Sequence, residues 1–191
     1  MYDPASFRLD GGVALVTGAG AGIGRAIAET FATAGAAVAV TDRDSGAAEA
    51  VATAITDAGG RAFGAACDVT KESDLVASVD RTVAEFGGLT ILINNAGGGG
   101  PKPFDMPMSD MRFAYELNLF SLFRLCQLAT PHMAQAGGGA IVNISSMSGE
   151  NKNQKMASYG SSKAAVTHLT RNIAFGLGPK NIRVKAIGPG G

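Results

Sequence analysis

Short apolar runs alternate with longer amphipathic stretches along the chain. Each short run is rich in β-branched residues and is bounded by Gly, Asp or Asn, a pattern typical of strands buried on both faces. These runs predict strands at residues 13–17, 37–41, 62–67, 89–93, 140–145 and 182–187. The stretches between them have a helical period and predict helices at residues 23–34, 45–58, 71–86, 109–136 and 158–177.

This alternation predicts an α/β fold with a doubly wound parallel sheet of about six strands. Because crossover connections are right-handed, a Rossmann-type strand order is favoured. Glycines that suit a left-handed helix end follow four of the predicted helices, at Gly35, Gly59, Gly87 and Gly137. No linker, repeat or low-complexity tract interrupts the pattern, so residues 1–191 are expected to form a single domain.

The predicted helix at residues 109–136 has apolar side chains around nearly its whole circumference. One stripe facing the sheet does not account for all of them. The helix is either buried within its own chain, or its outer face packs with the helix at 158–177 against a second subunit. We favour a homo-oligomer through these two helices, because the chain offers no further helix to cover them.

Composition excludes several classes of function. The chain has 16 Lys and Arg against 16 Asp and Glu, so it lacks the basic surplus that nucleic acid or an anionic membrane requires. It has neither a signal-peptide core nor an apolar run of about 18 residues that would span a membrane. Cys67 and Cys126 lack metal-ligand spacing and are expected to be buried free thiols, which favours a cytoplasmic location.

A glycine-rich turn follows the first predicted strand and opens a helix. It reads Thr17-Gly18-Ala19-Gly20-Ala21-Gly22-Ile23-Gly24. Glycine permits positive φ and removes the Cβ that would block close approach, so a pyrophosphate can reach the free N–H groups at the helix start. Gly24 is expected to let this helix pack closely on the strand. The strand–turn–helix setting makes a merely tight loop the weaker explanation.

Acidic residues follow the next two strands. Asp42 ends the second strand, where its carboxylate can bind both adenosine ribose hydroxyls and repel a 2′-phosphate. Arg43 either softens that repulsion or is a loop cation that stacks on adenine. Because Ala21 supplies no cation for a 2′-phosphate, NAD is favoured over NADP. Asp68 and Val69 either border the adenine or begin the next helix.

Three further residues suggest acid–base chemistry. Tyr159 and Lys163 lie four residues apart in a predicted helix and therefore share a face. Ser146 follows the fifth strand, so a doubly wound sheet brings all three beside the cofactor crevice. The spacing of Tyr159 and Lys163 alone is a weak signal, but its combination with the glycine-rich turn and Asn94-Asn95-Ala96-Gly97 is specific.

These motifs resemble the classical short-chain dehydrogenase/reductase family from about Leu9 to Gly191. The resemblance implies an oxidoreductase in which Tyr159 is the general acid/base and Lys163 assists its ionisation and holds the nicotinamide ribose. It implies that Ser146 orients the substrate oxygen and that Asn118 organises a water linking Lys163 to solvent. The implied cofactor-binding set is Gly18, Gly22, Ile23, Gly24, Asp42, Arg43, Asp68, Val69, Asn95, Gly97, Tyr159, Lys163 and Pro189. No metal is required, and His132 and His168 are expected to be structural.

Two loops bear on the substrate. Residues 97–107 and 150–153 resemble the loops of family members that act on the 7α-hydroxyl of steroids and bile acids. By this resemblance Gly99 and Asn151 contact the substrate together with Ser146 and Tyr159. The alternative is that both loops are ordinary rim loops without a selective role.

Two alternatives to steroid oxidation remain. One is an oxoacyl or sugar reductase of the same family. The other is a chain that binds NAD without turnover, because family members of this type continue with a further strand and a substrate-covering segment. On that expectation residues 182–187 form an exposed apolar edge strand. Lys185 also stands where relatives usually carry Asn, and Gly188 where Ala is common.

Overall fold

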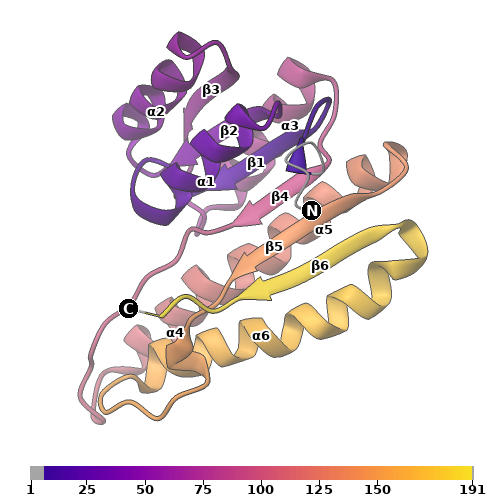
Figure 1. The fold of residues 1–191 in the computed structure, drawn as a ribbon. Helices are drawn as coiled ribbons and strands as arrows, with labels where there is room; N and C mark the ends of the chain where they lie inside the picture. Colours follow the sequence, from indigo (N-terminus) through magenta and orange to yellow (C-terminus); the bar gives the residue numbers. More distant parts are fainter. Residues whose placement is uncertain (1–6, 191) are drawn as a thin grey trace, which may run out of the picture.

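A computed structural model describes residues 7–190 of the chain. In this part of the chain, six strands form one parallel sheet in the order β3-β2-β1-β4-β5-β6 (Figure 1). The strands are β1 (Val13–Thr17), β2 (Ala37–Asp42), β3 (Arg61–Ala66), β4 (Ile91–Asn94), β5 (Gly139–Ile144) and β6 (Ile182–Ile187). The chain order reverses between β1 and β4, which confirms the predicted Rossmann-type sheet.

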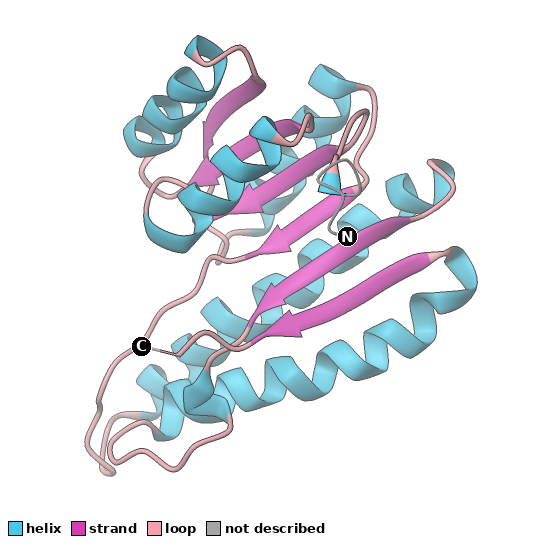
Figure 2. Cartoon of the chain, in the orientation of Figure 1, coloured by secondary structure: helices cyan, strands magenta, loops and turns pink. Residues whose placement is uncertain are grey.

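Helices cover both faces of this sheet (Figure 2). On one face α1 (Gly22–Thr33) and α2 (Ser45–Asp57) bury Ala28, Val51 and Ile55 against β1 and β2. On the other face the packing helices are α3 (Glu72–Phe86), α5 (Ser121–Gln135) and α6 (Ala157–Leu177). Two short 3₁₀ turns complete the order, η3 (Met147–Gly149) and η4 (Gly178–Lys180).

The helix predicted at residues 109–136 is not continuous. It consists of α4 (Met108–Tyr115), a π-helical turn η2 (Glu116–Phe120) and α5. The π turn holds Asn118, whose amide is buried and hydrogen-bonded to the backbone of Gly98. Hydrophobic periodicity does not reveal this break, because both halves of the helix are apolar on their inner sides.

The fourth strand begins and ends later than its apolar run indicated. It was predicted at 89–93 and spans Ile91–Asn94. Leu89 is fully buried but precedes the strand. Asn94 belongs to it despite being polar, because its side chain donates a 2.8 Å hydrogen bond to Asn143 Oδ1 on β5.

Strand β6 lies at the edge of the sheet, as expected. Its side chains alternate: Ile182 and Val184 are buried, whereas Arg183 and Lys185 are exposed. The strand is therefore anchored by the core on one face, and its exposed apolar residue is Ile187 at the end.

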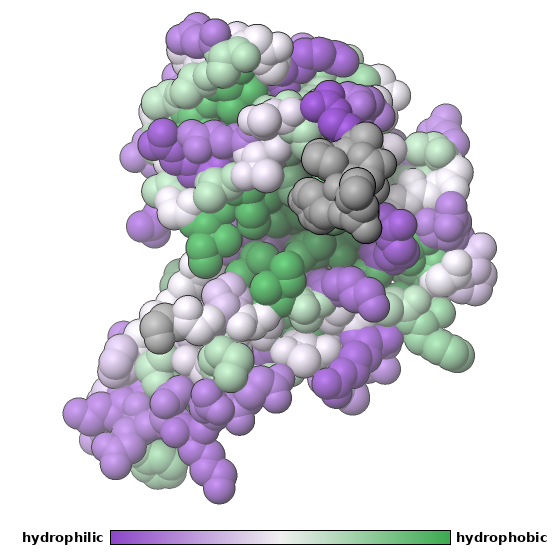
Figure 3. Space-filling view, in the orientation of Figure 1, coloured by the Kyte–Doolittle hydropathy of each residue, from purple (hydrophilic) through white to green (hydrophobic). Residues whose placement is uncertain are grey.

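Large apolar side chains also remain exposed on the outer helices. Phe120 and Phe123 are 52% and 41% exposed near the start of α5, and Phe175 on α6 is 90% exposed. These residues fit the expected apolar outer face of the two helices. Figure 3 shows a second apolar gathering, in the hollow between the two halves of the molecule.

Candidate active site

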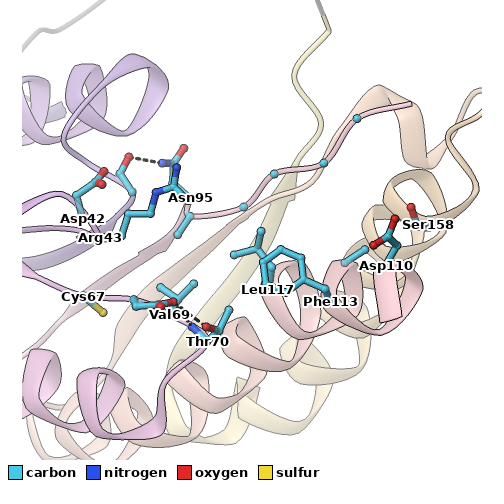
Figure 4. A pocket seen from close by; sticks show the side chains of 18 of the residues that line it. Asp42, Arg43, Cys67, Val69, Thr70, Asn95, Asp110, Phe113, Leu117 and Ser158 are labelled. Atoms are coloured by element: carbon cyan, nitrogen blue, oxygen red, sulfur yellow. Dashed lines mark hydrogen bonds between the residues drawn. The ribbon is translucent and has the colours of Figure 1, made fainter. Parts of the chain in front are cut away.

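A cavity of about 610 Å³ runs along the carboxyl edge of the sheet. Figure 4 shows Asp42, Arg43 and Asn95 at one end of it, with Asp110 and Ser158 at the other. Eight residues expected to bind cofactor or substrate line it: Gly18, Asp42, Arg43, Asp68, Val69, Asn95, Gly97 and Gly99. Parallel strands place such residues together because all their carboxyl ends meet at one edge.

The glycine-rich turn has the expected left-handed backbone. Gly18 has φ 61° and Gly22 has φ 54°, and α1 begins at Gly22. The N-cap residue is Ala21, which has no side-chain acceptor for the first N–H groups of the helix. Those donors are thus available to an anion. A Cβ on Gly24 would overlap the carbonyl oxygen of Gly18, so this helix does approach the turn as closely as predicted.

Asn95 holds the turn against the end of β4. Its Nδ2 donates hydrogen bonds of 2.9 Å to the carbonyl oxygens of both Thr17 and Gly18. Ile23 follows in the first turn of α1 and is half exposed. The sequence placed Asn95 at the cofactor border, and the structure adds that this side chain fixes the shape of the turn.

Asp42 faces the same turn from the end of β2. Its Oδ2 accepts a 3.0 Å hydrogen bond from the N–H of Gly20, and its Oδ1 accepts from the N–H of Asp44. A Cβ on Gly20 would lie 2.8 Å from the Cβ of Ala47 and 3.0 Å from Asp42 Oδ2, so glycine at this position lets the carboxylate approach the turn. The carboxylate is therefore held at the mouth of the turn.

Asp68 serves its own loop as well as the cavity. Its Oδ1 accepts hydrogen bonds from the N–H and the hydroxyl of Thr70, and this hydroxyl contact lowers the pKa of Asp68 most strongly. Lys71 lies 3.7 Å away as an ion partner. The residue thus meets both descriptions left open by its spacing, a cavity wall and part of the turn that leads into α3.

Tyr159 and Lys163 share a face of α6, as predicted. The Nζ atom of Lys163 lies 5.8 Å from the centre of the Tyr159 ring. It donates a 2.7 Å hydrogen bond to the carbonyl oxygen of Ile144, the last residue of β5. Burial lowers the pKa of Lys163 to about 8, because desolvation disfavours the ammonium form.

Ser146 lies two residues after the end of β5 and caps the start of the short turn η3. Its Oγ accepts a 3.1 Å hydrogen bond from the N–H of Ser148. The turn packs closely against α6, because a Cβ on Gly149 would lie 2.7 Å from the nitrogen of Ala164, and one on Gly160 2.7 Å from the oxygen of Ser148. These two glycines keep Ser146 beside the first turns of the helix that carries Tyr159.

Residues 97–99 link Asn118 to the two side chains on α6. A Cβ on Gly97 would lie 2.7 Å from Asn118 Oδ1 and 3.0 Å from Lys163 Nζ. Gly99 has φ 150°, and its Cβ would lie 2.6 Å from Tyr159 Cδ2. Gly99 therefore packs closely on the Tyr159 ring.

The remaining candidates lie at the rim. Asn151 is exposed in the loop after η3, and its N–H donates to the carbonyl oxygen of Met147. The carbonyl oxygen of Pro189 accepts a 3.2 Å hydrogen bond from the N–H of Met147. A 2.7 Å hydrogen bond from the N–H of Lys102 to the carbonyl oxygen of Lys155 joins the loop at 97–107 to the segment that follows the loop at 150–153.

Sequence reasoning missed two contributors to this site. The carbonyl oxygen of Ile144 holds Lys163, and backbone acceptors of this kind leave no trace in residue identity. Ser162, which directly precedes Lys163 in the sequence, is fully buried, and its hydroxyl accepts a hydrogen bond from Asn118. A serine on the inner face of a helix was a signal that could have revealed it.

Cys67 and Cys126 are buried free thiols, and burial raises their pKa values to about 11 and about 12. Among residues 7–190, no group of three His, Cys, Asp or Glu side chains is placed to hold a metal ion. Within the same residues no helix is both long and apolar enough to cross a membrane.

Comparisons with known proteins agree with this geometry. The family model described as short chain dehydrogenase matches residues 12–191. The 7α-hydroxysteroid dehydrogenase of Escherichia coli (strain K12) is 57% identical over 190 residues, which cover 100% of this chain and 74% of that enzyme. The D-threitol dehydrogenase of Mycolicibacterium smegmatis is 39% identical over 184 residues, 96% of this chain and 71% of the relative.

A solved structure is similar over the full chain. It is a 7α-hydroxysteroid dehydrogenase complexed with NADH and 7-oxo glycochenodeoxycholic acid, with a TM-score of 0.97 and 57% identity. The match covers 100% of this chain and 74% of that one. This chain therefore shares the arrangement of its sheet and helices with a protein whose structure contains NADH and a bile-acid ligand.

Proposed function

The chain belongs to the short-chain dehydrogenase family, and from this premise we propose that it transfers a hydride between the 7α-hydroxyl of a steroid or bile acid and NAD. The observation that carries the proposal is the packing of Tyr159, Lys163 and residues 97–99 into one cluster at the carboxyl edge of the sheet. In this proposal one Rossmann domain, spanning residues 1–191, both holds the nucleotide and carries the catalytic side chains.

The residues at the turn fit NAD. Gly18 and Gly22 leave the first N–H groups of α1 open to the pyrophosphate. Asp42, at the mouth of the turn, would face the adenosine ribose. Its carboxylate would accept hydrogen bonds from both ribose hydroxyls and repel a 2′-phosphate. We assign Val69, Asp68 and Arg43 to the adenine end of the cavity, and Ile23, Gly97 and Pro189 to the nicotinamide end.

Tyr159 acts in this mechanism as the general base during alcohol oxidation. NAD, when bound, supplies the acceptor for the hydride that leaves the carbinol carbon. Tyr159 takes the hydroxyl proton, and the product is a ketone, so the substrate loses one proton and one hydride. Lys163, held by Ile144 in a desolvated position, places a positive charge beside the Tyr159 ring.

Ser146 and Asn118 complete the catalytic set. Ser146 stands at the end of β5, where its hydroxyl would hydrogen-bond the substrate oxygen and set the carbinol carbon for transfer. Asn118 anchors the backbone of Gly98 and thereby the wall that contacts Tyr159 and Lys163. We keep the family's role for Asn118, in which it organises a water between Lys163 and solvent.

The steroid assignment is supported by the 57% identical enzyme. It is also supported by the bond from Lys102 to Lys155, which holds the loop at 97–107 beside the segment that follows the loop at 150–153. We propose that Gly99 and Asn151 lie along the sterol. The test is NADH formation with cholate, using a sugar alcohol and a hydroxyacyl thioester as comparison substrates. Turnover of cholate alone supports the steroid assignment. Turnover of a sugar or acyl substrate in its place contradicts it, and NADH binding without any turnover contradicts the assignment as an enzyme.

We also propose that the protein is a cytoplasmic homo-oligomer whose subunits meet through residues 109–136 and 158–177. The exposed side chains of Phe123 on α5 and Phe175 on α6 support the assembly, because a second copy would remove them from water. The two free thiols support a reducing compartment. The balanced charge favours a small-molecule partner over nucleic acid or a membrane surface.

A further inference from the structure

A buried hydroxyl joins the catalytic helix to the π turn. Ser162 is fully buried, and its Oγ donates a 2.7 Å hydrogen bond to the carbonyl oxygen of Tyr159. Ser162 Oγ also accepts a 3.1 Å hydrogen bond from Nδ2 of Asn118. Because a hydroxyl has a single proton, the bond to the Tyr159 carbonyl leaves the oxygen lone pairs for Asn118. The direction of both bonds is thereby fixed.

The amide of Asn118 is fully used in this arrangement. Its Nδ2 also donates to the carbonyl oxygen of Gly98, and its Oδ1 accepts from the N–H of Gly98, both at 2.9 Å. Asn118 is 1% exposed, so water does not replace a lost partner easily. Without Ser162, one amide proton would be buried without an acceptor, which favours a different side-chain position.

The Gly98 backbone lies between two glycines that touch the reacting groups. Gly97 packs against Lys163 Nζ, and Gly99 packs against the ring of Tyr159. Any displacement of Asn118 would move Gly98 and change both contacts. The hydrogen-bond chain from Ser162 through Asn118 to Gly98 therefore sets how closely this wall approaches Tyr159 and Lys163.

We propose that Ser162 is a positioning residue for hydride transfer, which fixes the wall at residues 97–99 against Tyr159 and Lys163 through Asn118. The inference rests on the proposed function only in taking Tyr159 and Lys163 as the reacting pair. A hydroxyl that bonds a carbonyl one turn earlier is common in helices and has no such consequence by itself. Ser161 shows that ordinary case, because its Oγ bonds the carbonyl oxygens of Ala157 and Ser158. Ser162 differs from Ser161 because its Oγ also accepts a hydrogen bond from the Asn118 amide.

Three variants of the full chain test this role. Ser162→Ala removes the hydroxyl, Ser162→Thr keeps it, and Ser161→Ala makes the same change one residue away, outside the hydrogen-bond chain. The first readout is hydrogen exchange at the Gly98 amide by NMR, which requires no turnover. The second is kcat, compared with the Kd for NADH, on cholate or on whichever secondary alcohol the wild-type chain oxidises. Failure with cholate thus contradicts the proposed function without affecting this comparison.

In Ser162→Ala we expect Gly98 exchange to accelerate about tenfold and kcat to fall about tenfold or more, since small misplacements at a reacting centre are costly. The Kd for NADH should stay near the wild-type value, Ser162→Thr should recover both readouts, and Ser161→Ala should match the wild type. Unchanged Gly98 exchange in Ser162→Ala would overturn the proposal. So would an unchanged kcat, or a Thr variant as impaired as the Ala variant.

Discussion

The ammonium group of Lys163 donates a 2.7 Å hydrogen bond to the carbonyl oxygen of Ile144. This contact joins the second turn of α6 to the last residue of β5, two positions before Ser146. The bond holds the Lys163 ammonium near the strand end that precedes Ser146, on the helix face that also carries Tyr159. The strand end and the helix start form a single unit around the site.

Burial of this amine predicts a pH dependence of stability. The pKa of Lys163 is lowered to about 8 in the folded protein, whereas the ordinary value is 10.5. Between these pH values the unfolded chain binds more protons than the folded one. The free energy of unfolding therefore rises with pH from about 8 to 10.5, as the penalty for burying a charged Lys163 disappears. Relative to Lys163→Met, the wild-type free energy of unfolding should rise by up to about 3 kcal/mol across it.

Urea unfolding of both proteins at several pH values measures this difference. Lys180→Met, which changes an exposed lysine of η4, serves as the control and should show no comparable trend against the wild type. The burial of Lys163 would be contradicted if the free energy of unfolding of the wild type, relative to that of Lys163→Met, fell with rising pH.

Glycine at position 99 should be required for turnover. A Cβ there would lie 2.6 Å from Tyr159 Cδ2, so Gly99→Ala must push the ring away or shift the wall. We expect kcat to fall about a hundredfold, while NADH still binds at the distant turn. The matched control is Gly100→Ala, because a Cβ at Gly100 meets nothing within 4 Å. Equal kcat values for the two variants would show that Gly99 does not position Tyr159.

Asp42 should determine the choice of dinucleotide. Asp42→Asn removes the negative charge but keeps the size of the side chain and the contact to Gly20. Fluorescence titration should show weaker NADH binding by about tenfold, because charge-assisted hydrogen bonds to the ribose are lost. NADPH should bind better than to the wild type, since the repulsion of the 2′-phosphate is gone. Asp57→Asn at the end of α2 should leave both affinities unchanged, and an unaltered NADH/NADPH ratio in Asp42→Asn would argue against this role.

Exposed phenylalanines on the outer helices should govern assembly. Phe123→Asp and Phe175→Asp place a charge on α5 and α6, and burial of each ring is worth about 1.5–3 kcal/mol. The double variant should therefore dissociate at concentrations at which the wild type sediments as an oligomer. Phe104→Asp is the control, because this ring is 98% exposed in the loop before α4 and belongs to neither α5 nor α6. Dissociation by Phe104→Asp alone would place the interface elsewhere.

Sequence reasoning predicted most of the framework. The glycine-rich turn lies between a predicted strand and a predicted helix, and Asp42 ends the next strand. The spacing of Tyr159 and Lys163 is weak alone and becomes specific only in combination with these features. Each strand also lies within two residues of its predicted bounds. These features are local, so their side-chain pattern reports the backbone that they form.

The unpredicted parts depend on contacts between distant residues. In the π turn, the amide of Asn118 bonds Gly98, twenty residues earlier, and Ser162, forty-four residues later. The place of Asn94 in β4 likewise depends on its bond to Asn143. The close approach of the Gly99 backbone to the Tyr159 ring is a further contact between distant residues, sixty positions apart in the sequence. No single-sequence pattern records such pairings.

Isotope transfer tests the central claim most directly. Cholate that carries deuterium at C7 is incubated with NAD and the wild-type chain, and the dinucleotide product is analysed by mass spectrometry. Hydride transfer to NAD predicts NADH with one deuterium and a 7-oxo steroid in equal amounts. Tyr159→Phe should form neither product while still binding NADH. Unlabelled NADH, or labelled product formed at the wild-type rate by Tyr159→Phe, would contradict the assignment of Tyr159 as the base in 7α-hydroxyl oxidation.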